Sequence, residues 1–364
     1  MRNLDRFVAT MTYKEFDHPP LLGEGAWQQT VQRWHSEGLE EGKYWTDYFG
    51  VKCFDIDWHG FNEGMFPRFE RKVLKETDEY TIFINESGTT VKDLKTGMSM
   101  PEWLEFPVKS RADLEAFLPR YIGRSQERLT ADFPKFLARF NSPDFDALLL
   151  PPIGGYWGTL RELCGVEVAA YMFYDCPDLV HKLMDGMCDN CCWFMEKFCR
   201  EVGPNFVCAG TGEDFAFKNG PFFSPAMFRE FFVPRYSRVL RIAQKHGVEL
   251  CFIDSDGNYE VLIPDLLKIG MNVQWPFEVA AGMDPVPLRA KYGKALRMMG
   301  GVDKRAVAAG KEAIRKELDR LFPLMCEGGY IPKIDHSISS DISWDNFRYY
   351  METLLEMHQR CANR

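Results

Sequence analysis

Two segments of this chain end an apolar run with residues that bind metal ions or move protons. Residues 248–253 lead into Asp254 and Asp256, and residues 329–334 lead, after one aspartate, into His336. A short apolar run bounded by turn residues is typical of a buried parallel strand. In proteins with such sheets, catalytic and ligand-binding residues lie just past the carboxyl ends of the strands. The sequence therefore predicts that Asp254, Asp256 and His336 lie together at one open edge, as metal ligands or as acid–base groups.

Other expected strand ends add polar and aromatic side chains to the same edge. Glu213, after a glycine-containing strand, is expected to be a further catalytic residue or ligand, with a structural ion pair as the alternative. The expected substrate-binding residues are Tyr156, Trp157, Glu278, Asp303 and Lys304. Each also has a structural interpretation. The two aromatic residues would be packing groups, and the charged residues would be structural partners at the barrel rim or solvated loop groups. The aspartates after residue 253 would alternatively cap the next helix, a position that Asn258 fits better.

Strands and helices alternate through the second half of the chain. Apolar strands are expected near residues 147–151, 205–209, 249–253, 271–275, 295–299 and 330–334. Helices are expected at 164–201, 225–246, 259–269, 286–292, 306–326 and 344–360. This alternation predicts an α/β protein with a parallel sheet, and the number of units favours a (β/α)8 TIM barrel. The alternative, an open doubly wound sheet, lacks the G-x-G-x-x-G that would follow an early strand.

The first 110 residues are expected to form an elaboration packed on the barrel, whose bulk is residues 111–364. This part is rich in aromatic residues, and 19–24 and 26–36 are expected to be its first strand and helix. Turn residues separate short β-prone runs between 70 and 93, which indicates a small antiparallel insertion.

Composition excludes several classes of function. The net charge of -9 argues against a nucleic-acid surface, and no apolar segment reaches the roughly 20 residues that span a bilayer. The N-terminus has no apolar core of a signal peptide, so a cytoplasmic protein is expected. Cys188 and Cys191 have zinc-ribbon spacing, but they also fall at helical intervals within an apolar stripe. Core packing is the favoured interpretation.

From about residue 148 to 358, the chain resembles the uroporphyrinogen decarboxylase superfamily in its sequence motifs and in their order. The motifs that carry the resemblance are Gly212-Glu-Asp214, Ser224-Pro-Ala-Met-Phe-Arg-Glu-Phe231, Asp254-Ser-Asp-Gly-Asn258, Leu262-Ile-Pro-Asp-Leu266, Gly300-Gly-Val-Asp303, Gly328-Gly-Tyr-Ile331 and Ser343-Trp-Asp-Asn346. The resemblance implies a (β/α)8 barrel and either of two activities. One is decarboxylation of a tetrapyrrole, and the other is metal-dependent methyl transfer involving a corrinoid protein or a thiol.

The chain departs from both branches of the superfamily. The methyltransferases carry His-x-Cys-Gly where this chain has Asp254, Asp256 and Gly257, and a later cysteine near His336. Carboxylates and imidazole in place of thiolates imply a divalent metal, zinc or a harder ion. The decarboxylases carry an arginine-bearing motif near the N-terminus, whereas residues 23–29 here are acidic and neutral.

Methyl transfer from a small methylated substrate to a corrinoid protein or thiol is therefore the expected function. The expected partners are that substrate, a corrinoid protein and a second copy of the chain, without nucleic acid or membrane. A uroporphyrinogen decarboxylase or related enzyme, which needs no cofactor, is the first alternative, and a non-catalytic ligand-binding barrel is the second.

Overall fold

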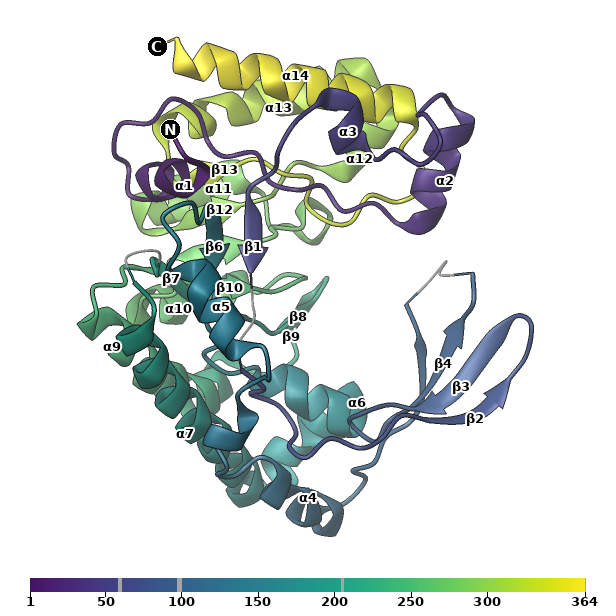
Figure 1. The fold of residues 1–364 in the computed structure, drawn as a ribbon, viewed down its shortest axis with the longest axis vertical. Helices are drawn as coiled ribbons and strands as arrows, with labels where there is room; N and C mark the ends of the chain where they lie inside the picture. The colour runs from purple at the N-terminus through teal and green to yellow at the C-terminus, as the bar shows by residue number, and fades with distance from the viewer. Residues whose placement is uncertain (58–60, 97–99, 204–205, 364) are drawn as a thin grey trace.

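The computed structural model describes residues 1–57, 61–96, 100–203 and 206–363. It is a mixed α/β structure built around a five-stranded parallel sheet, in the order β13-β12-β11-β10-β7 (Figure 1). The strands are β7 (Cys208–Gly212), β10 (Leu250–Asp254), β11 (Val273–Trp275), β12 (Arg297–Met299) and β13 (Tyr330–Ile331). They match five of the six strands expected in this half of the chain, and the sixth, near 147–151, is β6 (Ala147–Leu149).

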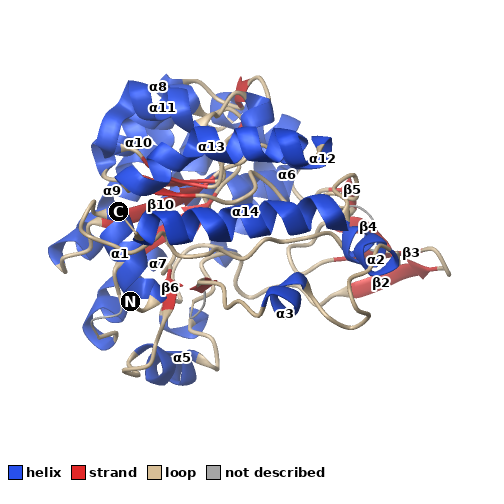
Figure 2. Cartoon of the chain, turned by 90° about the horizontal axis from the view of Figure 1, so that it is seen from above, coloured by secondary structure: helices blue, strands red, loops and turns tan. Residues whose placement is uncertain are grey.

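Helices connect these strands and cover the sheet, as Figure 2 shows. They are α6 (Tyr156–Asp175) and α7 (Pro177–Glu201) before β7, α8 (Pro225–Met227) and α9 (Val233–Lys245) before β10, α10 (Ile263–Ile269) before β11, α11 (Pro285–Tyr292) before β12, α12 (Lys304–Ala309) and α13 (Lys311–Glu327) before β13, and α14 (Trp344–Ala362) at the end. The Ser224 side chain caps α8 by accepting the Met227 N–H, and Gly270 ends α10 with a φ of 93°. The single helix predicted over 164–201 is two helices, because Pro177 begins a new helix instead of continuing α6.

Strand residues alternate between two apolar clusters. Leu250 and Phe252 belong to one cluster, while Cys251 and Ile253 belong to the other. This period of two buries both faces of the sheet, which explains why the strand sequences are continuously apolar. Cys188 and Cys191 are buried free thiols on α7, so the prediction of core packing is confirmed.

Further parallel pairings extend beyond the five-stranded sheet. Strand β1 (Asp55–Asp57) pairs with β6 in parallel. Isolated parallel bridges join Leu22 to Phe54, Pro152 to Gly210, Val302 to Ile334 and Ala26 to Ile338. The strand expected at 19–24 is thus represented by a single bridge, and the helix expected at 26–36 is α2 (Gln28–Ser36).

The N-terminal part also contains α1 (Asn3–Met11), α3 (Trp45–Phe49) and the expected antiparallel insertion. The insertion is a four-stranded sheet of β2 (Lys72–Glu76), β3 (Tyr80–Ile84), β4 (Thr90–Leu94) and β5 (Glu102–Glu105). The last of these strands lies beyond the range 70–93 expected from the sequence. We call it the arm sheet. It projects from the rest of the molecule in the view of Figure 1. Helices α4 (Arg111–Phe117) and α5 (Phe133–Phe140) follow it. No helix within the described ranges is long and apolar enough to cross a membrane.

Candidate active site

A cavity of about 380 Å³ lies at the carboxyl ends of β7, β10, β11 and β13. Its lining residues are Gly23, Gly25, Asp214, Asp254, Asp256, Trp275, Pro276, Lys333, Ile334, His336 and Ser337. We call it the mouth cavity. Asp254, Asp256 and His336, predicted from the sequence to lie together, all line it. Residues far apart in the sequence are thus gathered at one edge of the sheet, as parallel strands require.

Three side chains around this cavity form a group able to hold a metal ion. One ligand atom each of Asp256, Glu278 and His336 lie within 4.8 Å of one another. Asp254 was predicted from the sequence to belong to this group, but among the described residues Glu278 takes that place. We call Asp256, Glu278 and His336 the carboxylate–histidine trio. The His336 Nε2 atom lies 3.5 Å from an Asp256 carboxylate oxygen, and this interaction raises the pKa of His336.

Backbone contacts between the loops after β10 and β11 bring the trio together. The Gly257 N–H donates to the Glu278 carboxylate at 2.8 Å. Gly257 has a φ of 74°, and a Cβ there would lie 2.5 Å from the Ala216 carbonyl oxygen. The close approach of Gly257 to Ala216, in the segment after β7, therefore requires glycine. The sequence contained this signal in Asp-Ser-Asp-Gly-Asn, but the partner of the glycine N–H was not predictable.

Asp335, beside His336, ties three of the loops to one another. Its carboxylate accepts the N–H of Val279 at 2.9 Å and the N–H of Lys304 at 3.2 Å. Burial raises the pKa of Asp335 to about 6. This buried aspartate fixes the backbone next to Glu278 and His336, so it has a positioning role that was not predicted from the sequence.

Asp254 lies in the same cavity and differs from its neighbours in its contacts. No hydrogen bond or ion pair of its carboxylate occurs among the described residues, whereas Asp214 binds Arg161 at 2.9 Å. Burial, and then the negative charges of Asp256 and Asp214, raise the pKa of Asp254 to about 7. Asp254 is thus a carboxyl group that is available to contact a substrate and able to exchange a proton near neutral pH.

Lys333 supplies positive charge to the cavity, held by a buried glutamate. Its Nζ lies 3.4 Å from Glu24, which also accepts the Tyr350 hydroxyl at 2.8 Å and the Ile334 N–H at 3.1 Å. Lys333 also lies over the ring of Trp275, 5.6 Å from its centroid. Glu24, Lys333 and Trp275 were not predicted as site residues, because each is an ordinary core or strand residue until the fold brings them to the mouth.

Glu213 does not line the mouth cavity; it caps a helix. Its carboxylate accepts the N–H of Tyr156 at 2.6 Å, the N–H of Gly158 at 2.9 Å and the hydroxyl of Tyr236. The two N–H groups belong to the first turn of α6, where a helix has no internal acceptor for them. Burial raises the pKa of Glu213 to about 8, against the opposing effect of these three hydrogen bonds. The geometry therefore favours a structural role for Glu213, but as a helix cap and not as the ion pair that was weighed as the alternative.

Four further residues expected in the site do not line the mouth cavity. Tyr156 and Trp157 are fully buried at the start of α6, and Trp157 stacks on Phe222 with ring centroids 5.2 Å apart. Asp303 caps α12 and pairs with Arg305 at 2.8 Å. These side chains do not line the mouth cavity, and neither does that of Lys304. The Asn258 side chain accepts the Glu260 N–H at 3.2 Å, but the N-cap position of the helical segment that begins at Glu260 is held by Tyr259, so Asn258 is not the cap expected from the sequence.

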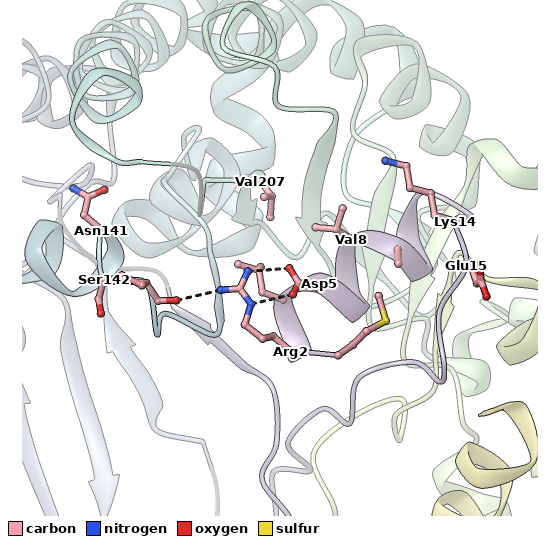
Figure 3. A pocket seen from close by; sticks show the side chains of 12 residues that line it. Arg2, Asp5, Val8, Lys14, Glu15, Asn141, Ser142 and Val207 are labelled. Carbon is pink, nitrogen blue, oxygen red and sulfur yellow. Dashed lines mark hydrogen bonds and ion pairs between the residues drawn. The ribbon is translucent and has the colours of Figure 1, made fainter. Parts of the chain in front are cut away.

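A larger cavity, of about 650 Å³, lies elsewhere, between α1, residues 141–143 and Val207 (Figure 3). Val207 precedes β7, so this cavity is at the amino end of that strand, away from the mouth. Arg2 lines it and already binds Asp5 through two hydrogen bonds of 2.9 Å. Active sites of parallel α/β folds lie at the carboxyl ends of strands, so size alone does not make this cavity the candidate.

Comparison with known proteins agrees with the sequence motifs. Residues 147–357, more than half of the chain, match the uroporphyrinogen decarboxylase (URO-D) family. The chain belongs to this family. Within this URO-D family member, all three residues of the carboxylate–histidine trio fall in the matched segment. A solved structure, a methyltransferase from Methanosarcina mazei, superposes with a TM-score of 0.62 over 98% of this chain and 99% of that chain. At 12% identity this likeness concerns the fold. No curated protein sequence matches the chain.

Proposed function

We propose that this URO-D family member transfers a methyl group from a small methylated substrate to a corrinoid on a partner protein, or to a thiol. The observation that carries the proposal is the convergence of Asp256, Glu278 and His336 to within 4.8 Å beside the mouth cavity. A methyl donor must lose its methyl carbon from a heteroatom, and that atom keeps the electron pair of the broken bond. A site for this reaction needs groups that stabilise the growing negative charge on the leaving atom.

The proposal includes a closed (β/α)8 barrel as the scaffold. In its support, parallel bridges continue the sheet from β7 through Pro152 to β6, and then to β1 and Leu22. The bridge between Ala26 and Ile338 would join the first strand to the last. The mouth cavity would then be the upper opening of the barrel, where enzymes of this fold carry their sites.

The donor set of the trio fits a divalent metal. Two carboxylates and one imidazole give three protein ligands, the number that catalytic zinc sites use when one position stays open. Harder ions are also compatible with oxygen ligands. Asp256, Glu278 and His336 would hold the ion, and His336 would lose the proton that its contact with Asp256 favours. A bound ion would act as a Lewis acid toward the leaving heteroatom.

The remaining side chains would bind and orient the substrate. Asp254 lines the cavity with no partner for its carboxylate among the described residues, so this group would hydrogen-bond the substrate or exchange a proton with the leaving atom. Lys333 and Trp275 add one cationic and one aromatic group to the cavity wall. Three aspartates line this cavity, which disfavours the polycarboxylate substrate of a tetrapyrrole decarboxylase.

Methyl transfer itself tests the proposal. Purified protein would be loaded with zinc or cobalt and given methyl ethers, methylamines and methyl thioethers, with reduced cobalamin or a thiol as acceptor. Methylation of cobalamin is followed by its absorbance change, and methylation of the thiol by mass. We expect turnover with one donor class, lost in His336→Ala and kept in Leu94→Glu, a substitution on the arm sheet. No methylated product with any donor or acceptor, together with carbon dioxide release from uroporphyrinogen, would assign the chain to the decarboxylase branch.

A further inference from the structure

Two cysteine thiols meet on one face of α7, away from the mouth cavity. The Sγ atoms of Cys188 and Cys192 lie 4.0 Å apart, and Cys192 is half-buried while Cys188 is buried. Residues four apart on a helix are neighbours on its surface, which explains why these two side chains meet. Cys191, which has zinc-ribbon spacing from Cys188, instead donates to a Glu63 carboxylate oxygen at 3.7 Å. We call Cys188 and Cys192 the thiol pair.

The thiol pair lies beside α9, which packs against α7 (Figure 1). The Cys188 thiol donates to the Arg235 carbonyl oxygen of α9 at 3.5 Å. Arg238, three residues further along α9, is held by the Asp189 carboxylate at 2.6 Å. The hydrogen bond with Cys192, and then the positive charge of Arg238, lower the pKa of Cys188 against the effect of burial. Because the thiolate is the form of cysteine that binds metal ions, these surroundings favour metal binding.

The thiol pair offers two soft ligands without a third side-chain ligand. In the described part of the chain, no other histidine, cysteine or acidic ligand atom lies within 4.8 Å of both sulfurs. Structural zinc sites have four protein ligands and catalytic zinc sites have three, so two thiols do not make a zinc site. Cu(I) is the ion that sulfur ligands select, and two thiolates in a near-linear arrangement satisfy its coordination. The number and type of ligands therefore favour Cu(I).

The separation of the two sulfurs agrees with an ion between them. At a metal–sulfur distance of about 2.3 Å, sulfurs 4.0 Å apart enclose an angle of about 120° at the ion. A linear arrangement needs about 4.6 Å, which small rotations of the two side chains supply. A disulfide instead needs Cβ atoms about 3.8 Å apart, whereas residues four apart on a helix have Cβ atoms about 5–6 Å apart. The helix therefore favours a bridging ion over a disulfide.

We propose that Cys188 and Cys192 bind one Cu(I) ion as a pair of thiolate ligands. Each thiol gives its proton to solvent as its sulfur binds the ion, and no electron is transferred. Two thiolates and one Cu(I) carry a single net negative charge, which the neighbouring guanidinium of Arg238 offsets. A divalent ion would make the site neutral and would gain nothing from Arg238. This site is separate from the carboxylate–histidine trio, whose oxygen and nitrogen ligands suit harder ions.

Competition for Cu(I) with a coloured chelator tests the site. The reduced full-length protein is titrated without oxygen against the Cu(I) complex of bathocuproine disulfonate, and X-ray absorption counts the sulfur neighbours of the bound copper. We expect one tightly held Cu(I) per chain with two sulfur neighbours. Cys188→Ser and Cys192→Ser are each expected to lower the affinity more than about 100-fold, because changes outside the ligand shell alone cost about 10–100-fold. Arg238→Met, which removes the neighbouring charge and keeps both ligands, is expected to cost about 10–100-fold.

Cys199→Ser is the matched control, since Cys199 is another half-buried free thiol of α7. It is expected to leave the Cu(I) affinity unchanged, as is His336→Ala, which removes a member of the trio. A wild type that holds no Cu(I) against the chelator, three or more sulfur neighbours, or equal binding by Cys192→Ser would each overturn the proposal. So would a loss in Cys199→Ser as large as that in Cys192→Ser. Unchanged affinity in Arg238→Met would overturn the charge argument. None of these outcomes depends on methyl transfer or on a metal at the trio, so they are distinct from failure of the proposed function.

Discussion

Replacing Glu213 with glutamine keeps the shape of a buried helix cap and removes its ionisation. In the folded protein the pKa of Glu213 is raised to about 8 from an ordinary 4.5. At about 1.36 kcal/mol for each pKa unit, ionising this buried group costs about 5 kcal/mol. Because folding raises the pKa of Glu213, the contribution of its protonated carboxyl group to the free energy of unfolding is fully present below pH 4.5. That contribution is lost as the pH rises to about 8. Glutamine has one acceptor oxygen, so one N–H of α6, that of Tyr156 or Gly158, loses its partner, at a cost of about 1–3 kcal/mol.

These two effects have opposite pH dependences, so the stability curves are expected to cross. At pH 5 the Glu213→Gln variant is expected to be less stable than wild type by about 1–3 kcal/mol. Near pH 8 it is expected to equal or exceed wild type, because it has no carboxyl group to ionise. Denaturant unfolding at half-unit steps from pH 5 to pH 9 measures the difference directly. A difference that stays constant across this range would show that Glu213 does not titrate there, and would refute the reasoning.

Three further substitutions test a strained backbone position, a buried ion pair and a proposed catalytic group. Gly300→Ala places a Cβ 2.1 Å from the Pro276 carbonyl oxygen at a φ of 101°, so a loss of about 1–3 kcal/mol in unfolding free energy is expected; an unchanged denaturant midpoint would contradict it. Lys333→Met leaves Glu24 buried without its cation and is expected to lower the thermal midpoint, with partial recovery when Glu24→Gln is added; a larger loss in the double variant would argue against the ion pair. Asp254→Asn is expected to lower kcat by about 10²–10⁴-fold in the methyl-transfer assay, and full activity would remove Asp254 from the chemistry.

The sequence predicted where polar groups would gather but not which of them would touch. Apolar runs that stop at Asp254 and at His336 located the mouth, because a parallel sheet brings the carboxyl ends of its strands to one edge. The choice of Glu278 as the third member of the trio depends on a loop contact with Gly257. Sequence spacing carries no information on that contact.

The sequence pattern does not distinguish a catalytic residue at a strand end from a buried structural one. Glu213 and Tyr156 follow glycines at strand ends, a pattern shared by catalytic and capping residues. Only the position of the α6 N-terminus decides between the two. Lys333 and Glu24 form a pair between opposite ends of the chain, and neither segment alone indicates the other. The arm sheet was predictable from its turns, whereas its anchorage on α6, through the Thr89 hydroxyl and the Val108 N–H, was not.

The proposed methyl transfer depends most directly on Asp256, Glu278 and His336 acting as metal ligands. Calorimetric titration of chelator-treated protein with zinc, cobalt and manganese measures this binding without any substrate. Wild type is expected to bind one ion, with affinity lowered at least about 100-fold in Glu278→Gln and in His336→Ala and changed less than about threefold in Asp254→Asn. The glutamine side chain of Glu278→Gln keeps an oxygen for the Gly257 N–H, so the loop is retained. Failure of wild type to bind any of the three ions, or equal binding by Glu278→Gln, would contradict the central claim.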